Sequence, residues 1–379
     1  MLKKILFVVT AAVCITSGIT EAVQAAQIEI LASGLNNPRG LTFGPDGDLY
    51  VAEAGTGGLS NRCVPSPSQI GATLCYGATG AVTRIHNGIS KRVVTGLPSI
   101  GLSSGNGSYG PHDIKFDPAT GKAYVLVGFA SDARNRDNII GNKNIGSLLA
   151  INSFDGSSSW TKITDLLRFE ITNDPDRHGL ISNPYSFTIK DNTAYVVDSG
   201  ANDFSNVALD TGAVSLQTVF PIRTVTNPSN GQNSSIQSVP IAVTVGPDGA
   251  LYVAEFTGYP YPSNESRIYR IVPGQQPVVY ATGFTQIIDI AFDAAGNLDV
   301  LQYGDETLPS NANTVLQSSG VLIRVAPDGT RQDIVRGGGA LVSPNSLAIG
   351  PDNAIYVTNY GTSAGKGQVI RITDNVVAH

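Results

Sequence analysis

One hairpin pattern that occurs six times constrains the fold of this chain more than any other feature. In the first copy, Asn37–Gly58, two short apolar runs flank the turn sequence Gly44-Pro45-Asp46-Gly47. Proline fixes φ at the first central position of such a turn, and glycine accepts the positive φ that follows. β-forming runs around turn residues predict a hairpin. The further copies are Gly110–Gly128, Asn183–Gly200, Val239–Gly258, Gln286–Gly304 and Ser343–Gly361.

A second pair of β-forming runs is expected after each hairpin, so that a unit holds four strands. Examples are Ala81–Ile85 with Lys91–Thr95, Ser147–Ile151 with Trp160–Ile163, Arg267–Ile271 with Val278–Tyr280, and Gly320–Val325 with Arg331–Val335. Four antiparallel strands in each of six units are typical of a β-propeller. We therefore predict an all-β fold, a six-bladed propeller, in which Ser131–Gly146 and Phe220–Ser238 are loops.

The two ends of the chain predict how the ring closes. The last unit provides only Gly367–Ile372 after its hairpin, whereas a lone β-forming run, Gln27–Ala32, precedes the first unit. We expect Gln27–Ala32 to be the fourth strand of the sixth blade, which leaves the ring without an open edge.

The N-terminal sequence has the layout of a secretory signal peptide. Lys3 and Lys4 precede the apolar run Ile5–Ile15, and small residues follow. The apolar run is shorter than the ~20 residues that span a membrane, which argues against a membrane anchor. We predict a signal peptide at 1–25, one propeller domain at 26–379, and a periplasmic or extracellular location.

The charge and composition exclude several classes of partner. The net charge is −6, and it becomes −7 without residues 1–25. An acidic chain without a basic cluster argues against nucleic-acid and anionic-membrane partners. The later apolar runs do not reach transmembrane length, so we expect no stable membrane insertion. We expect a monomer with a small aromatic molecule or a protein partner at one face.

Two cysteines, Cys63 and Cys75, remain once Cys14 leaves with the signal peptide. A cysteine pair in an exported chain most simply forms a disulfide, here across a loop rich in proline and serine. That loop contains no histidine, which argues against a zinc site.

Propeller geometry assigns the connections to two faces. The starts of the first strands and the ends of the second strands share one face, and the tight turns lie on the other. The long second-to-third connections belong to the first face, where binding loops usually concentrate. They include the cysteine loop, Phe129–Ile145, Tyr259–Ser266 and Asp305–Ser319.

Polar residues recur at the aligned strand ends on that face. The first strands start with Arg39, His112, Tyr185, Ile241, Ile288 and Asn345, and next come Gly40, Asp113, Ser186, Ala242, Asp289 and Ser346. The second strands end with Glu53, Val127, Asp198, Glu255, Gln302 and Asn359. Converging titratable groups indicate a ligand or catalytic site at the channel mouth. Hydrogen bonds between blades around a hydrated channel would give the same pattern, and both interpretations stay open.

The histidines are the sharpest candidates for chemistry. We assign catalytic roles to His112 and Asp113, because a histidine can act as a base or a metal ligand there. A channel histidine held by hydrogen bonds is the alternative. The residues assigned to ligand binding are Arg39, Tyr185, Asn345 and His178.

Carboxylates at the second-strand ends suggest a metal. Glu53, Asp198 and Glu255 provide the oxygen ligands that calcium and magnesium prefer. Propeller lactonases and lyases use comparable sites, which is an analogy of fold only. The expected cofactor is a divalent metal, namely calcium, magnesium or a redox metal.

The whole chain after residue 25 resembles the ScyD/ScyE family, exported NHL-like propellers associated in cyanobacteria with synthesis of the sunscreen pigment scytonemin. The cysteine loop and first-blade sequence are the more specific part of the resemblance. The segments that carry it are Gly34–Gly58, Gly77–Ile85, Arg92–Ser99, Gly110–Ile114 and Ser182–Tyr185.

The resemblance implies a role in late scytonemin assembly, with oxidative coupling of an indole–phenol precursor at the channel mouth. Such a reaction would need a cavity for flat aromatic rings, and the sequence offers Tyr185, Tyr259 and Tyr261 in addition to the histidine and carboxylates near the mouth. Two other classes stay open. One is a non-enzymatic binding or scaffold protein for pigment intermediates or a protein partner, and the other is a metal-dependent lactonase or lyase.

Overall fold

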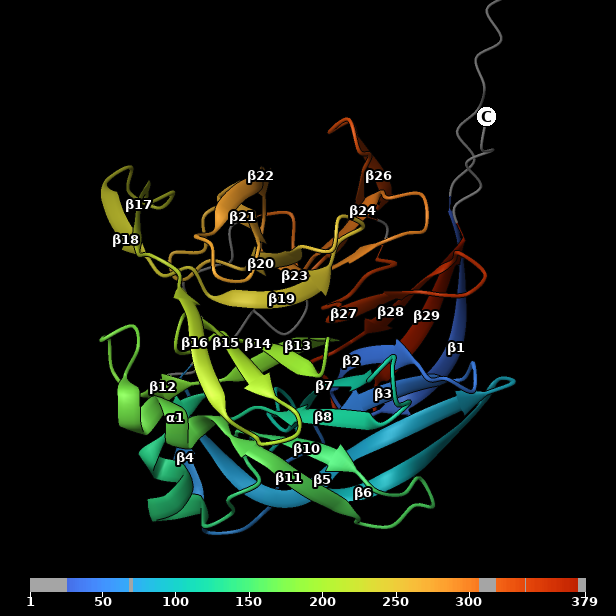
Figure 1. Cartoon of the computed structure of the whole chain (residues 1–379), viewed down its shortest axis with the longest axis vertical. Coiled ribbons are helices and arrows are strands. Elements are labelled where there is room, and N and C mark those ends of the chain that lie inside the picture. The colour runs from blue at the N-terminus through green and yellow to red at the C-terminus, as the bar shows by residue number, and fades with distance from the viewer. Residues whose placement is uncertain (1–25, 68–70, 307–317, 338, 374–379) are drawn as a thin grey trace, which may run out of the picture.

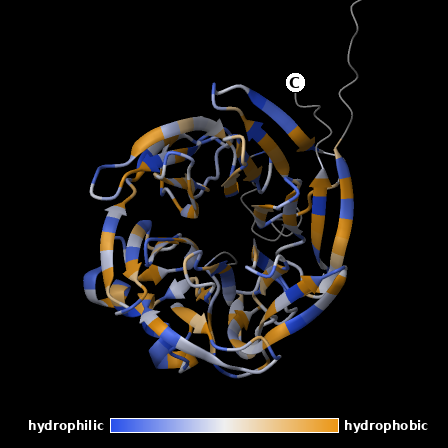
Figure 2. Ribbon diagram, turned by 45° about the vertical axis from the view of Figure 1, so that its right-hand side comes forward, coloured by the Kyte–Doolittle hydropathy of each residue, from blue (hydrophilic) through white to orange (hydrophobic). Residues whose placement is uncertain are grey.

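A computed structural model of the chain confirms the six-bladed propeller (Figure 2). It describes residues 26–67, 71–306, 318–337 and 339–373. The predicted signal peptide and most of the connection Asp305–Ser319 lie outside these ranges. The strands at the rim of the ring mix hydrophilic and hydrophobic residues (Figure 2), as expected for sheets with one face toward water.

Each blade is an antiparallel sheet whose first strand lies nearest the axis. Blade 1 consists of β2 (Pro38–Phe43), β3 (Leu49–Glu53), β5 (Thr73–His86) and β6 (Ile89–Gly101), with the short β4 (Cys63–Pro65) on β5. Blade 2 consists of β7 (Pro111–Phe116), β8 (Ala123–Val127), β10 (Ser147–Ile151) and β11 (Trp160–Asp165). Blade 3 consists of β13 (Pro184–Lys190), β14 (Thr193–Asp198), β15 (Asp203–Ala208) and β16 (Val214–Val219).

The other three blades repeat this arrangement. Blade 4 consists of β19 (Pro240–Val245), β20 (Leu251–Glu255), β21 (Ser266–Ile271) and β22 (Val278–Phe284). Blade 5 consists of β23 (Ile287–Phe292), β24 (Leu298–Gln302), β25 (Val321–Val325) and β26 (Arg331–Arg336). Blade 6 consists of β27 (Ser346–Ile349), β28 (Ile355–Asn359), β29 (Gly367–Thr373) and β1 (Gln27–Leu35). The first strands contact one another around the axis in the order β2, β7, β13, β19, β23, β27 and back to β2.

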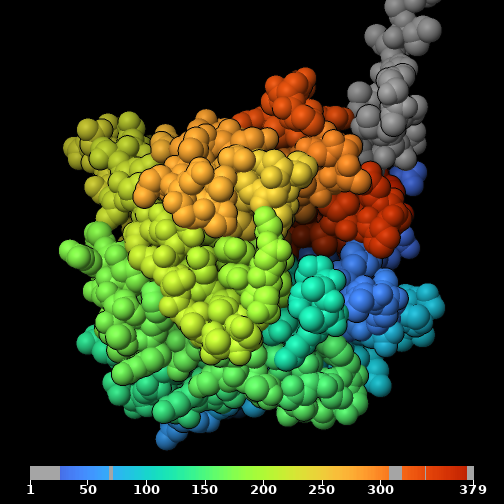
Figure 3. Space-filling view, viewed as in Figure 1, coloured from blue at the N-terminus to red at the C-terminus, as the bar shows by residue number. Residues whose placement is uncertain are grey.

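The predicted closure of the ring is confirmed. β1 pairs antiparallel with β29, from Gln27 opposite Thr373 to Leu35 opposite Gly367. The blue N-terminal strand therefore lies beside the red C-terminal strand in Figure 1, and their atoms adjoin in Figure 3. The closing strand is three residues longer than the predicted run Gln27–Ala32.

The second strands lie between two sheets of neighbouring blades and form the core. All residues of β3, β8, β20, β24 and β28 are buried. On the tight-turn face, the tyrosine of the second strand binds the aspartate of the turn, as in the 2.8 Å bond that Tyr50 Oη donates to Asp46 Oδ2. The turns thus have a structural role, and the long connections lie on the opposite face.

Two segments predicted as loops contain regular structure instead. Phe220–Ser238 includes the hairpin of β17 (Arg223–Thr226) and β18 (Asn233–Ile236), which stands out from the ring in Figure 1. Ser131–Gly146 includes β9 (Ser131–Asp132) and the π-helix η1 (Arg136–Ile140). Both are short and polar, so their local sequences lack the apolar alternation that predicts a strand.

The α-helix α1 (Leu166–Asn173) was not predicted either. It begins after Asp165, whose side chain accepts a 3.0 Å hydrogen bond from the Arg168 backbone N–H as an N-cap. Leu166, Leu167 and Glu170 form its buried face. No helix in the described ranges is long and apolar enough to cross a membrane.

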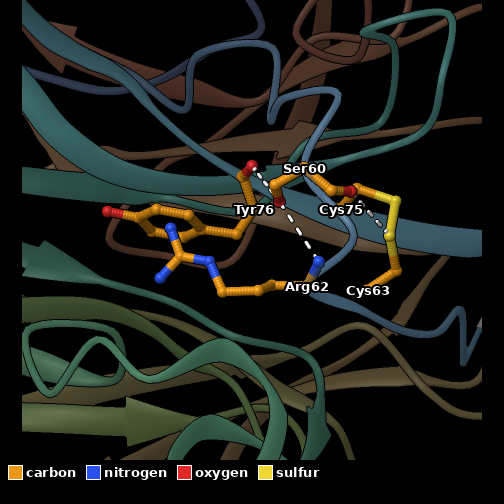
Figure 4. Close-up of a disulfide and its surroundings, with 5 residues drawn as sticks. All are labelled: Ser60, Arg62, Cys63, Cys75 and Tyr76. Carbon is orange, nitrogen blue, oxygen red and sulfur yellow. Dashed lines mark hydrogen bonds between the residues drawn. A yellow bond between two sulfur atoms is a disulfide. The ribbon is translucent and has the colours of Figure 1, made fainter.

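A disulfide joins Cys63 of β4 to Cys75 of β5, as Figure 4 shows. Next to it the guanidinium of Arg62 lies 4.1 Å from the centre of the Tyr76 ring (Figure 4). Arg62 Nη1 also donates a 2.9 Å hydrogen bond to the backbone oxygen of Ile140, in η1. The cysteine loop is therefore attached to the second blade.

Candidate functional site

In five of the six blades, the polar residue at the end of the second strand binds the segment that precedes the first strand. Glu53 Oε2 accepts a 2.7 Å bond from the Asn36 backbone N–H, just before β2. Asp198, Gln302 and Asn359 accept equivalent bonds from the backbone N–H groups of Asn183, Thr285 and Val342, and Glu255 accepts one from Ser238 Oγ. These five hydrogen bonds connect the end of a second strand to the segment before the first strand of the same blade. They explain why these positions are polar without requiring a ligand.

This result corrects the predicted metal site. Glu53 is fully buried and pairs with Arg92, and Glu255 pairs with Arg223. Asp198 accepts bonds from Ser182 Oγ and from three backbone N–H groups. In the described ranges, the only close group of three or more His, Cys, Asp or Glu side chains is Glu170, Asp174 and Asp176. Glu53, Asp198 and Glu255 are therefore held in separate blades by separate partners and do not form one site.

The start of the first strands does bring predicted residues together. Arg39 Nη1 lies 3.4 Å from Tyr185 Oη, and Asn345 Nδ2 donates a 3.0 Å hydrogen bond to the same oxygen. Arg39 Nη2 donates a 2.8 Å bond to the backbone oxygen of Ser108. These side chains come from blades 1, 3 and 6 and meet across the channel. We call Arg39, His112, Tyr185 and Asn345 the mouth cluster.

In His112, one ring nitrogen contacts the backbone and the other has no hydrogen-bond partner among the described residues. Its Nδ1 lies 3.2 Å from the Pro184 backbone oxygen, which can only accept, so Nδ1 carries the proton. Burial, and then the charge of Arg39, lower the pKa of His112 well below its usual value. Its Nε2 is buried and has no partner among the described residues. A Cβ at Gly128 would lie 2.2 Å from His112 Nδ1, so the absence of a side chain there makes room for the ring.

Two aspartates form the next layer of the channel. Asp113 Oδ2 accepts bonds of 3.0 Å from Ser186 Oγ and 3.1 Å from the Phe187 N–H, which belong to the next blade. Across the ring, Asp289 binds Ser346 Oγ and the Leu347 N–H in the same way. The predicted catalytic residue Asp113 therefore joins two blades.

One lysine compensates both aspartates. Lys115 Nζ donates a 2.9 Å bond to Asp113 Oδ1. Although burial opposes it, the charges of Asp113 and Asp289 raise the pKa of Lys115. The small–Asp–Ser order of Gly40, Asp113 and Ser186 recurs as Ala242, Asp289 and Ser346, but Ala291 stands where Lys115 would repeat. The sequence alone shows that these positions recur from blade to blade. That Lys115 interacts with both Asp113 and Asp289 is seen only in the structure.

The channel between these layers is narrow. Its lining includes His112, Asp113, Tyr185 and Asp289, and it has room for about one water molecule. A molecule with an aromatic ring therefore does not fit inside the channel, and only a small polar group can reach the mouth cluster.

A divalent metal does not fit the mouth cluster. Its donors are a guanidinium, an imidazole, a phenol and an amide, and the positive charge of Arg39 repels a cation. The carboxylates of the next layer, Asp113 and Asp289, each accept a hydrogen bond from the next blade. Lys115 donates a hydrogen bond to Asp113, and its positive charge also interacts with Asp289.

The buried carboxyl of Asp289 predicts a pH-dependent stability. Burial raises the pKa of Asp289 to about 6. The folded state then holds this proton to a higher pH than the unfolded state, so stability is lost as the pH rises from about 4 to about 6. Relative to an Asp289→Asn variant, we expect the wild type to lose about 2 to 3 kcal/mol between pH 4 and pH 7.

Urea unfolding of both proteins across this pH range measures the difference. An exposed turn residue, Asp210, provides the control, because Asp210→Asn should leave a constant offset from the wild type. A constant offset for Asp289→Asn as well would contradict the prediction.

The remaining predicted site residue, His178, is exposed and does not join the mouth cluster. Its backbone N–H donates a 2.8 Å bond to Asp176 Oδ1, and its ring contacts the Asp176 backbone oxygen. Tyr109, which sequence analysis did not select, does belong near the mouth, since its ring centre lies 5.7 Å from that of His112. Tyr109 lies in a connection between blades, outside the repeated hairpin, so the alignment of the repeats did not indicate it.

Comparisons with known proteins agree with the fold. No protein-family model and no curated protein matches the chain. Among solved structures, the chain is similar to a Thermus thermophilus protein proposed to be an oxidoreductase (glucose dehydrogenase), with 15% identity, a TM-score of 0.54, and coverage of 92% of this chain and 100% of that one. It is also similar to a Xanthomonas campestris gluconolactonase, with 7% identity, a TM-score of 0.52, and coverage of 92% and 90%.

A third structure, of a protein proposed to be a gluconolactonase, has 12% identity, a TM-score of 0.50, and coverage of 93% of this chain and 94% of that one. At such identities the likeness concerns the fold and carries no information about substrates. The chain shares the six-bladed propeller fold of these proteins.

Proposed function

We propose that this protein binds the acidic group of a small planar aromatic molecule at the channel mouth. The observation that carries the proposal is the guanidinium of Arg39, which is 5% exposed and pairs with no carboxylate in the described part of the chain. A buried charge without a partner costs free energy. A carboxylate or phenolate of a ligand would remove that cost.

The surroundings of Arg39 support an aromatic ligand. Arg39 Nε has no hydrogen-bond partner among the described residues, so a donor is left for a ligand. The rings of Tyr109 and Tyr185 flank His112, with centre distances of 5.7 and 4.9 Å. Because the channel is narrow, the acidic group would reach the mouth cluster while the rings stay outside it, next to the connection that contains Ser108 and Tyr109.

The resemblance to the ScyD/ScyE family suggests the chemical class of the ligand, an indole–phenol precursor of scytonemin in an exported setting. Oxidative coupling of such a precursor needs an oxidant or a redox metal. The charge of Arg39 opposes a metal at the mouth, so the residues there favour recognition of the precursor over its oxidation. The proposed role is therefore that of a binding protein for pigment intermediates.

Replacement of Arg39 tests this proposal. We expect scytonemin monomer, indole-3-carboxylate and 4-hydroxybenzoate to bind the protein in isothermal titration calorimetry. Arg39→Met should weaken binding about 10- to 100-fold, the effect of losing a hydrogen bond to a charged group. Arg336→Met removes a charge from an exposed ion pair and should leave affinity unchanged.

The neutral amides of the two simple acids provide a matched ligand control, since they keep the ring and lack the charge. Equal binding of acids and amides, or unchanged affinity in Arg39→Met, would contradict recognition of an acidic group.

A second candidate function rests on His112. Its Nε2, which has no hydrogen-bond partner among the described residues, has a lone pair that can accept a proton from a bound substrate, as a lyase or lactonase requires. Hydrolysis of simple lactones or elimination that is lost in His112→Gln, with ligand affinity retained, would favour this enzyme over a binding protein.

A further inference from the structure

A second group of polar residues lies at the end of α1, away from the channel. Glu170 is in the last turn of the helix, Asp174 is its C-cap, and Asp176 follows. One carboxylate oxygen of each lies within 4.8 Å of the others. We call these three residues the α1 acidic group. α1 lies at the left edge of the ring in Figure 1.

The burial of Glu170 distinguishes this group from an ordinary acidic surface. Glu170 is 2% exposed, and neither of its carboxylate oxygens has a hydrogen-bond partner among the described residues. Ser205 Oγ, from β15, is also buried and without a partner there. Glu170 and Ser205 line the same cavity, together with Asp198 and Asp203, and the cavity has room for about one water molecule or ion. Buried polar atoms that lack protein partners indicate a bound water or ion.

The electrostatics favour a cation. Within the described ranges, no lysine or arginine forms an ion pair with the α1 acidic group or with Asp198 or Asp203. Glu170 is buried close to Asp174 and Asp176 and lines the same cavity as Asp198, so several acidic side chains lie together. The C-terminal end of a helix also carries a partial negative charge, which disfavours carboxylates and favours cations.

The neighbouring side chains show which oxygens are free to bind. Asp198 already accepts four hydrogen bonds, from Ser182 Oγ and from three backbone N–H groups. Asp176 accepts a 2.9 Å bond from Asn202 Nδ2 through Oδ2 and a bond from the His178 N–H through Oδ1, which orient its carboxylate and leave a second lone pair on each oxygen for a cation. Glu170 and one oxygen of Asp174 have no such partner among the described residues. These atoms are available for a ligand.

We propose that Glu170, Asp174 and Asp176 bind a calcium ion. All the donors are oxygens, and they come from a single short segment at a helix end. Calcium accepts six to eight oxygen ligands in irregular geometry, whereas magnesium requires a near-octahedral set at shorter distances. The ion would neutralise three clustered carboxylates and join the end of α1 to blade 3 through Asp176 and Asn202.

Metal titration of the protein tests the site. After treatment with EDTA and dialysis, we expect calcium chloride to bind with one ion per chain in calorimetry. At a hundred times the dissociation constant, the melting temperature should rise by about 4 °C, as expected for a ligand that binds only the folded state. Magnesium chloride should bind more weakly.

The variant Glu170→Gln should weaken calcium binding at least about 10-fold, because it removes the buried carboxylate. Asp174→Asn is the second variant, since its side chain is less buried and its loss threatens the fold less. Asp210→Asn removes an exposed carboxylate and should bind calcium like the wild type. Far-ultraviolet circular dichroism establishes that each variant is folded.

Absence of calcium binding, or wild-type affinity in both Glu170→Gln and Asp174→Asn, would overturn the proposal. Tighter binding of magnesium than of calcium would overturn the choice of ion. The test is independent of the proposed ligand at the mouth, because Arg39→Met should retain calcium binding.

Discussion

A chain that begins at Asn36, without the closing strand, is expected to lose the cooperative unfolding of the propeller. β1 pairs with β29 along seven positions, and its removal opens the edge of blade 6. β29 has buried apolar side chains on both of its faces, Val369 on one and Ile370 and Ile372 on the other, and the open edge exposes them to water. Circular dichroism during heating should show a broad transition at least 15 °C below that of the parent, or aggregation, because a destabilisation of ~10 kcal/mol is large against the stability of a domain.

The missing strand itself provides the control. A synthetic peptide of residues 26–35, added to the truncated chain, should restore a sharp transition, whereas a scrambled peptide should not. Single substitutions refine the test, since Ile30 is 58% exposed and Ala32 only 7%. Ile30→Asp should be tolerated and Ala32→Asp should destabilise. A truncated chain that melts like the parent would show that the ring does not depend on this closure.

Gly40→Ala is expected to destabilise the protein by about 4 kcal/mol, at the upper end of overpacking effects. An added Cβ would lie 2.1 Å from Asp113 Oδ1 and 2.8 Å from the Asp113 Cα. Rotation of the aspartate would relieve the first contact, at the cost of its bonds to Lys115 and Ser186, but not the second, because that atom is backbone. β2 and β7 would have to move apart. Urea denaturation measures the change.

Ala242 is the equivalent residue in blade 4, and it provides a matched control. Ala242→Gly adds backbone freedom and removes one methyl group, so we expect a loss of only ~1 kcal/mol. A Gly40→Ala variant as stable as Ala242→Gly would mean that the channel layer adapts to added volume. The close contact between β2 and β7 would then not require glycine at position 40.

Residues from different blades could be predicted to meet at the channel mouth because the repeat fixes their register. His112 and Tyr185 occupy the same position in successive hairpins, and strand pairing places such positions on one face of a propeller. For the same reason, the six-bladed fold and its closure by the N-terminal strand followed from the hairpin pattern alone.

The roles of the residues in those columns did not follow from the pattern. Glu53 and Glu255 lie at strand ends where the sequence predicts metal ligands. Each instead forms an ion pair with an arginine and accepts a hydrogen bond from the segment that precedes its blade. A carboxylate binds whichever donor comes within reach, and the donors here come from segments outside the repeat. The position of a residue was therefore predictable where its partner was not.

The amino-acid sequence by itself determined the architecture, the closure of the ring and the set of residues around its axis, because these depend on a short pattern repeated along the chain. Only the tertiary structure decided that Arg39 is buried and has no carboxylate partner in the described part of the chain, that Lys115 lies close to the charges of two aspartates, and that Glu170 lies with Asp174 and Asp176 next to blade 3. Those features depend on burial and on the distance between charges from irregular segments, and neither quantity is encoded by a local period.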